Sequence, residues 1–118
     1  MSLDKTKHGD VHVLTPRKDL SGGEETRELE RAIQEVISQG VPHVVVDLGH
    51  VSYINSAGLG TLVALHTSCR NRQGYLRLAQ IGKRIKNLFL ITRLNFVFET
   101  FDSVDDALSG IDRSEQKS

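Results

Sequence analysis

Residues 44–60, which read VVVDLGHVSYINSAGLG, decide the fold. The first five of them are mostly β-branched and apolar, which is typical of a strand covered on both faces, as the strands of parallel sheets are. We therefore predict a central strand at Val44–Leu48. A loop from Gly49 to Asn55 follows, and either Asn55 or Ser56 is a natural N-cap for a helix that begins there.

Two glycines, Gly58 and Gly60, fall in the first turn of that predicted helix. Each costs a helix about 0.8 to 1 kcal/mol relative to alanine, so another requirement must favour them. One interpretation is local: the first turn approaches the sheet too closely for a Cβ atom. The other is functional: a partner or a modifying enzyme docks against exposed backbone. The sequence leaves both interpretations open.

The residues before this stretch predict a hairpin and a helix. Two short strands, Leu3–Lys7 and Val11–Leu14, are separated by a turn at Gly9. Ser21 with Glu24 three residues later has the spacing of a capping box, and Gly40 would end the helix that follows. Apolar residues recur along this helix at the spacing of one buried face: Leu29, Ala32, Ile33, Val36 and Ile37.

Beyond the central stretch, helical and strand patterns continue to alternate. The helix that starts near Ser56 has an apolar stripe, and it is followed by a strand at 75–78, a helix at 83–91, a strand at Phe96–Phe98 and a short helix capped by Ser103. This alternation predicts a mixed sheet with helices packed against it. The predicted stripe consists of Leu59, Leu62, Val63 and His66, with Cys69 at its edge.

Composition narrows the possible functions. The chain has 118 residues, enough for one domain, and its 15 basic and 15 acidic residues give a net charge of 0. A general electrostatic attraction to nucleic acid or to anionic lipid therefore has no support. No apolar run could span a bilayer, and the single cysteine, Cys69, favours a reducing compartment. We expect a cytoplasmic protein with a disordered C-terminal tail at residues 112–118.

The sequence contains no legible constellation for catalysis. The five histidines are scattered without metal-ligand spacing, and His66 on an apolar stripe is more typical of a satisfied core histidine than of a ligand. Ser56 lacks the glycine spacing of a nucleophile elbow. We therefore predict no catalytic residues, no metal and no cofactor. A small-ligand or nucleotide module that uses the amides near Gly58 remains an alternative.

The same stretch resembles the STAS domain, named for sulfate transporters and anti-sigma-factor antagonists. In that family a strand ending in an apolar-Asp-apolar step precedes a D-S-[SA]-G-L-G turn. Residues 91–98 and 101–108 are similar to the family's C-terminal pattern, and Asp19 matches the aspartate of its G-E-L-D loop. The resemblance implies an α/β, STAS-like mixed β-sheet packed against amphipathic helices, in one domain at residues 1–111.

The resemblance also implies a non-catalytic switch, with Ser56 at the position of the phosphorylatable serine. Unphosphorylated, such a protein binds an anti-sigma factor that is itself a serine kinase, and the sigma factor is released. Phosphorylation ends the binding, and a PPM-type serine phosphatase restores it. We expect a monomer or weak homodimer without direct contacts to nucleic acid or membrane. The expected partner-binding residues are Asp19, Ser21, Asn55, Ser56, Ala57 and Gly58.

Two residues depart from the family pattern. Asn55 stands where many members carry aspartate, and Arg93 replaces a usual glycine. The first change removes a negative charge beside Ser56, so a scaffold subunit of a stress-signalling assembly, without phosphorylation, is the alternative. The switch interpretation requires that the Ser56 hydroxyl be accessible where the loop becomes a helix.

Overall fold

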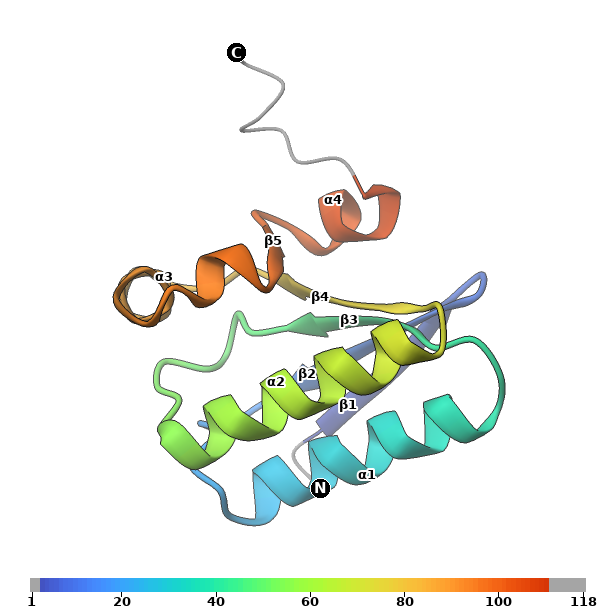
Figure 1. The fold of residues 1–118 in the computed structure, drawn as a ribbon, viewed down its shortest axis with the longest axis horizontal. Helices are drawn as coiled ribbons and strands as arrows, with labels where there is room; N and C mark the ends of the chain where they lie inside the picture. The colour runs from blue at the N-terminus through green and yellow to red at the C-terminus, as the bar shows by residue number, and fades with distance from the viewer. Residues whose placement is uncertain (1–2, 111–118) are drawn as a thin grey trace.

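The computed structural model describes residues 3–110, which form one five-stranded sheet with helices on both faces (Figure 1). The predicted domain end at residue 111 and the tail at 112–118 lie outside the described residues. In chain order the elements are β1 (Leu3–His8), β2 (Val11–Pro16), α1 (Glu24–Ser38), β3 (His43–Asp47), α2 (Ser56–Asn71), β4 (Tyr75–Ala79), α3 (Lys83–Thr92), the 3-10 helix η1 (Leu94–Phe96), β5 (Glu99–Phe101) and α4 (Val104–Ser109).

The strands lie in the sheet in the order of the chain. β1 and β2 form the predicted antiparallel hairpin, with Gly9 in the turn at a φ of 60°, and every later neighbour pairs in parallel. β3 is the third of the five strands, so the prediction of a central strand at this position is confirmed. The α/β fold with a mixed sheet is confirmed as well.

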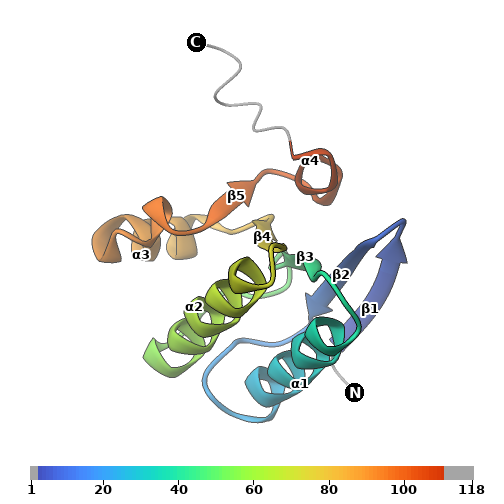
Figure 2. The same cartoon turned by 45° about the vertical axis from the view of Figure 1, so that its right-hand side comes forward.

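Two apolar cores lie on opposite faces of the sheet. Val44 and Val46 face the larger core, which α1, α2 and α3 cover, and Val45 faces a smaller core beneath α4. Figure 2 shows α4 on the side of the sheet opposite α1 and α2. The valine run of β3 is therefore covered on both faces, because alternate side chains along a strand point to opposite faces.

Helix α1 begins differently from the prediction. Its N-cap is Gly23, without a side-chain cap, so the expected capping box of Ser21 and Glu24 is wrong. The Thr26 hydroxyl instead accepts a hydrogen bond of 2.9 Å from the backbone N–H of Gly22. The predicted apolar face of α1 is confirmed, because all five of its residues are buried.

The buried stripe of α2 is rotated from the predicted one. Leu62, Leu65 and Cys69 are fully buried, whereas Leu59, Val63 and His66 are only partly buried. Leu65 belongs to the stripe and was not predicted, because α2 packs against α1 as well as against the sheet. Burial raises the pKa of the Cys69 thiol to about 11, which fits a small buried apolar residue.

The predicted strand at Phe96–Phe98 is also wrong. Phe96 ends the 3-10 helix η1, and the last strand, β5, begins at Glu99. Phe98 is buried in the larger core, where its ring stacks on Phe89 with centroids 5.5 Å apart. Phe98 packs inward, whereas Phe96 is 80% exposed and Val97 is 38% exposed, so this apolar run forms a turn between α3 and β5 and not a strand.

Arg93 ends α3 in a left-handed conformation, with a φ of 63° and a ψ of 17°. A side chain is strained there by about 1 to 2 kcal/mol, whereas glycine is not. We expect Arg93→Gly to raise the free energy of unfolding by about 0.5 kcal/mol, since greater freedom of the unfolded chain offsets part of the relief. Urea denaturation of this variant and of Arg93→Ala measures the effect. An equal increase in the free energy of unfolding of both variants would show that the lost charge, and not relief of backbone strain, causes the effect.

Candidate functional site

Two loops meet where α2 begins. Residues 17–23 lie beside residues 49–55, and Leu20 forms an isolated parallel bridge with Ile54. The Leu20 N–H donates to the Tyr53 carbonyl at 3.2 Å, and the Asn55 N–H donates to the Leu20 carbonyl at 3.1 Å. Both Leu20 and Ile54 are buried. The bridge therefore joins the loop before α1 to the loop that leads into α2.

Asp19 holds the second loop by its carboxylate. Its Oδ1 accepts from the Ser52 N–H at 2.9 Å, the Tyr53 N–H at 3.2 Å and the Ser52 hydroxyl at 3.2 Å. These are charge-assisted hydrogen bonds, which are shorter and stronger than neutral ones. The carboxylate therefore positions the loop that leads to Ser56.

Asn55 is the N-cap of α2, and both ends of its amide are used. Its Oδ1 accepts from the Gly58 N–H at 2.9 Å, and its Nδ2 donates to the Ser21 carbonyl at 2.9 Å. An ionised aspartate could accept the first bond but could not donate the second. Asparagine at this position thus holds the loop of Ser21 against α2, which a carboxylate could not do.

Close packing explains one of the two glycines in the first turn of α2. A Cβ atom on Gly58 would overlap the Leu20 carbonyl oxygen, whereas one on Gly60 would meet nothing within 4 Å. Across the same contact, Gly22 has a φ of 86°, and its Cβ would lie 2.8 Å from that of Ala57. Close packing is therefore confirmed for Gly58, although its neighbour is the loop at Leu20 and not the sheet, and it is wrong for Gly60.

Ser56 is the first residue of α2, and its side chain is exposed. Ala57 beside it is exposed too. Within residues 3–110 the Ser56 hydroxyl has no hydrogen-bond partner. The switch interpretation requires an accessible Ser56 hydroxyl. The structure meets this requirement, because neither packing nor a hydrogen bond within residues 3–110 shields this oxygen from solvent.

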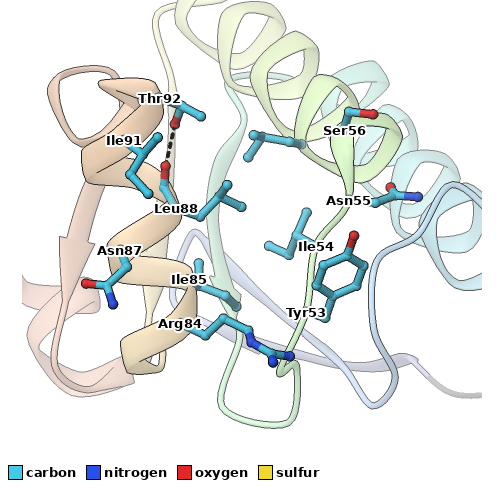
Figure 3. A pocket seen from close by; sticks show the side chains of 11 residues that line it. Tyr53, Ile54, Asn55, Ser56, Arg84, Ile85, Asn87, Leu88, Ile91 and Thr92 are labelled. Atoms are coloured by element: carbon cyan, nitrogen blue, oxygen red, sulfur yellow. Dashed lines mark hydrogen bonds between the residues drawn. The ribbon is translucent and has the colours of Figure 1, made fainter.

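A groove of about 600 Å³ separates the start of α2 from α3. Ser56 and Leu59 line one wall, and Arg84, Leu88 and Ile91 line the other. In Figure 3 the side chains of Ile85 and Leu88 point into the space between the two helices, and Arg84 extends toward Tyr53. Ile91 is 81% exposed, which is unusual for a large apolar side chain.

The structure brings the six expected partner-binding residues to one end of the molecule, but in different roles. Ser56 and Ala57 are exposed, Asp19 and Asn55 fix the loops, Ser21 contributes its carbonyl oxygen, and Gly58 is buried. The wall that α3 contributes was not among the predicted site residues. The available signal was the basic composition of α3, which contains no acidic residue.

Residues 3–110 contain no group of three histidine, cysteine or acidic side chains that could hold a metal ion. None of the helices there has the length and apolar character needed to cross a bilayer.

His66 is partly buried against Phe98, and its Nδ1 has no hydrogen-bond partner among residues 3–110. The prediction of a satisfied histidine is therefore wrong for this nitrogen.

Comparison with known proteins identifies the family. The family model of the STAS domain matches residues 2–107. The chain belongs to the STAS domain family. Its STAS relatives include the anti-sigma-B factor antagonist of Listeria monocytogenes, which is 38% identical over 65 residues, 55% of this chain and 56% of the relative. At the level of the family, anti-sigma-factor antagonism is therefore supported.

Solved STAS structures share the fold. A candidate anti-sigma factor antagonist from Thermotoga maritima superposes with a TM-score of 0.83 at 21% identity, covering 92% of this chain and 93% of that one. The phosphorylated form of the Bacillus cell fate determinant SpoIIAA superposes with a TM-score of 0.71 at 14% identity, covering 91% and 96%. At these identities the likeness concerns the fold.

Proposed function

We propose that this STAS domain is an anti-sigma-factor antagonist controlled by phosphorylation of Ser56. The unphosphorylated form binds an anti-sigma factor that is a serine kinase, and the sigma factor is released. Phosphorylation of Ser56 by that kinase ends the binding, and a PPM-type serine phosphatase restores it. The domain itself catalyses nothing and acts in the cytoplasm.

The exposed hydroxyl of Ser56 at the first position of α2 is the observation that carries this proposal. A phosphate there would carry a charge of about −1.5 to −2 at pH 7. The N-terminus of a helix favours an anion, so the domain would remain folded after modification. A partner packed against Ser56 would instead have to desolvate the phosphate, so the modification acts on the complex.

Ser56→Asp is expected to weaken binding of the partner kinase about tenfold, because a charge enters the interface. Ser56→Ala keeps the surface neutral and is expected to retain wild-type affinity. Isothermal titration calorimetry with each purified anti-sigma kinase of the source organism measures both variants. Circular dichroism spectra of the variants control for folding.

Equal affinity of the two variants for a kinase that binds the wild type would contradict the proposal. So would the absence of phosphate on Ser56 after incubation with that kinase and ATP, measured by phosphopeptide mapping. Failure of every such kinase to bind the wild type would contradict the choice of partner.

The scaffold alternative has one observation in its favour. Asn55 holds the loop of Ser21 with its amide and places no negative charge beside Ser56. A scaffold subunit would form a stable assembly of several proteins and would carry no phosphate. Native mass spectrometry of the protein isolated from its source cells, together with phosphopeptide mapping, separates the two functions.

A further inference from the structure

Helix α3 carries an unbalanced positive charge. From residue 80 to residue 98 the basic residues are Lys83, Arg84, Lys86 and Arg93, and no aspartate or glutamate occurs. All four side chains are exposed, and none forms a salt bridge within residues 3–110. The chain as a whole has a net charge of 0, so this concentration of charge is local.

The position of these cations is unfavourable for the helix itself. Lys83, Arg84 and Lys86 lie at its N-terminal end, with no acidic residue in the first turn. The helix dipole is positive at this end, so basic residues there destabilise the helix. The stability of the helix therefore does not explain these basic residues, whereas an acidic group on a binding partner would.

One of these cations lies in the groove beside Ser56. Arg84 lines the α3 wall, together with Leu88 and Ile91, and Ser56 lines the opposite wall. Figure 3 shows Arg84 at one end of the groove, with the apolar side chains of Ile85, Leu88 and Ile91 following along α3. The groove thus combines an apolar floor with a cation that lacks a partner in the described structure.

We propose that this groove binds an acidic amphipathic segment of the anti-sigma kinase, so the inference rests on the proposed function. Apolar side chains of the segment would pack against Leu88 and Ile91, and its carboxylates would face Arg84. A helix laid into an apolar groove is a common mode of peptide recognition. Charge complementarity at its edge would set the orientation and the rate of association.

This occupant gives the switch a physical mechanism. A phosphate on Ser56 would place a charge of about −1.5 to −2 on the wall opposite Arg84, in the same groove as the carboxylates of the segment. This phosphate would compete with the carboxylates of the segment for Arg84 and would also repel them. Phosphorylation therefore weakens binding of the segment, because the phosphate occupies Arg84 and repels the carboxylates of the segment.

A protein segment fits this surface better than a nucleic acid or a membrane does. Polyanions bind extended basic surfaces, whereas Arg84 is the one basic residue among those that line this groove. The groove walls are apolar, with Leu59 on α2 facing Leu88 and Ile91 on α3. Such walls match the side chains of an amphipathic helix.

Arg84→Glu tests the proposal, with Lys86→Glu as the matched control. Lys86 lies on the same helix and is equally exposed and unpaired, but it does not line the groove. We expect Arg84→Glu to weaken binding of the purified anti-sigma kinase about tenfold or more and Lys86→Glu to weaken it less than about threefold. Both variants should melt slightly above the wild type, because glutamate suits the first turn of a helix.

The outcomes separate this proposal from the proposed function. If Ser56→Asp weakens the complex but Arg84→Glu does not, the groove proposal is wrong and the switch stands. Equal effects of both charge reversals would indicate general attraction and would also overturn it. Tighter binding of single-stranded RNA or of phosphatidylglycerol vesicles than of the kinase, lost in Arg84→Glu, would assign the groove to another occupant.

Discussion

Gly58→Ala is expected to lower the free energy of unfolding by about 3 kcal/mol, at the upper end of the usual cost of overpacking. The new Cβ atom would overlap the Leu20 carbonyl oxygen and would lie 2.8 Å from the Leu20 carbonyl carbon. These are backbone atoms, so no rotation of a side chain relieves the contact. The loop before α1 would have to move, and its bridge to Ile54 would be lost or distorted.

Gly60→Ala is the matched control for this substitution. Gly60 lies in the same turn of α2 and is exposed, and a Cβ atom added to it would meet nothing within 4 Å. Alanine there should raise the free energy of unfolding by up to about 1 kcal/mol, because it favours the helix over glycine. Guanidinium denaturation followed by far-UV circular dichroism measures both. Equal stability of the two variants would contradict the close packing at Gly58.

Asn55→Ala is expected to lower the free energy of unfolding by about 2 kcal/mol, because two hydrogen bonds are lost. One caps the Gly58 N–H, and the other holds the Ser21 carbonyl. The same variant should release the loop before α1, so amide hydrogen exchange in residues 19–22 should become faster. Denaturation and exchange measurements on the same sample test both effects.

Asn55→Asp separates the two bonds. It keeps an acceptor for the Gly58 N–H but has no donor for the Ser21 carbonyl when it is ionised. We expect a loss of about 1 kcal/mol, between the wild type and Asn55→Ala, with faster exchange of the loop. A stability equal to that of the wild type would show that the bond to Ser21 contributes nothing.

The alternation of strands and helices could be predicted because it depends on local pattern. The valine run of β3, the apolar face of α1 and the Ser103 cap of α4 each lie within a few residues of sequence. Periodicity reports which face of an element is apolar, and a capping side chain acts three residues away. These elements needed no knowledge of their neighbours.

The errors occurred where distant segments decide the local structure. Ser21 does not cap α1, because the helix begins at Glu24 with Gly23 as its N-cap, and the Ser21 carbonyl accepts a bond from Asn55, 34 residues away. Phe98 is not part of a strand, because its ring packs on Phe89 and His66 in the core. Leu65 is fully buried because α2 contacts α1 along its length. The spacing of Leu62, Leu65 and Cys69 is helical, so periodicity allows this stripe, but only the contact with α1 selects it.

In the candidate site, too, some features follow from local sequence and others from contacts between distant segments. The sequence by itself determined that a capped helix with a serine at its start follows a buried strand, because capping and β-propensity act between near neighbours. Only the tertiary structure decided that Gly58 packs on Leu20, that Asp19 and Asn55 fix the two loops, and that α3 forms the second wall of the groove. Those contacts join residues far apart in the chain, 33 positions for Asp19 with Ser52 and 34 for Ser21 with Asn55, and chain packing alone brings such residues together.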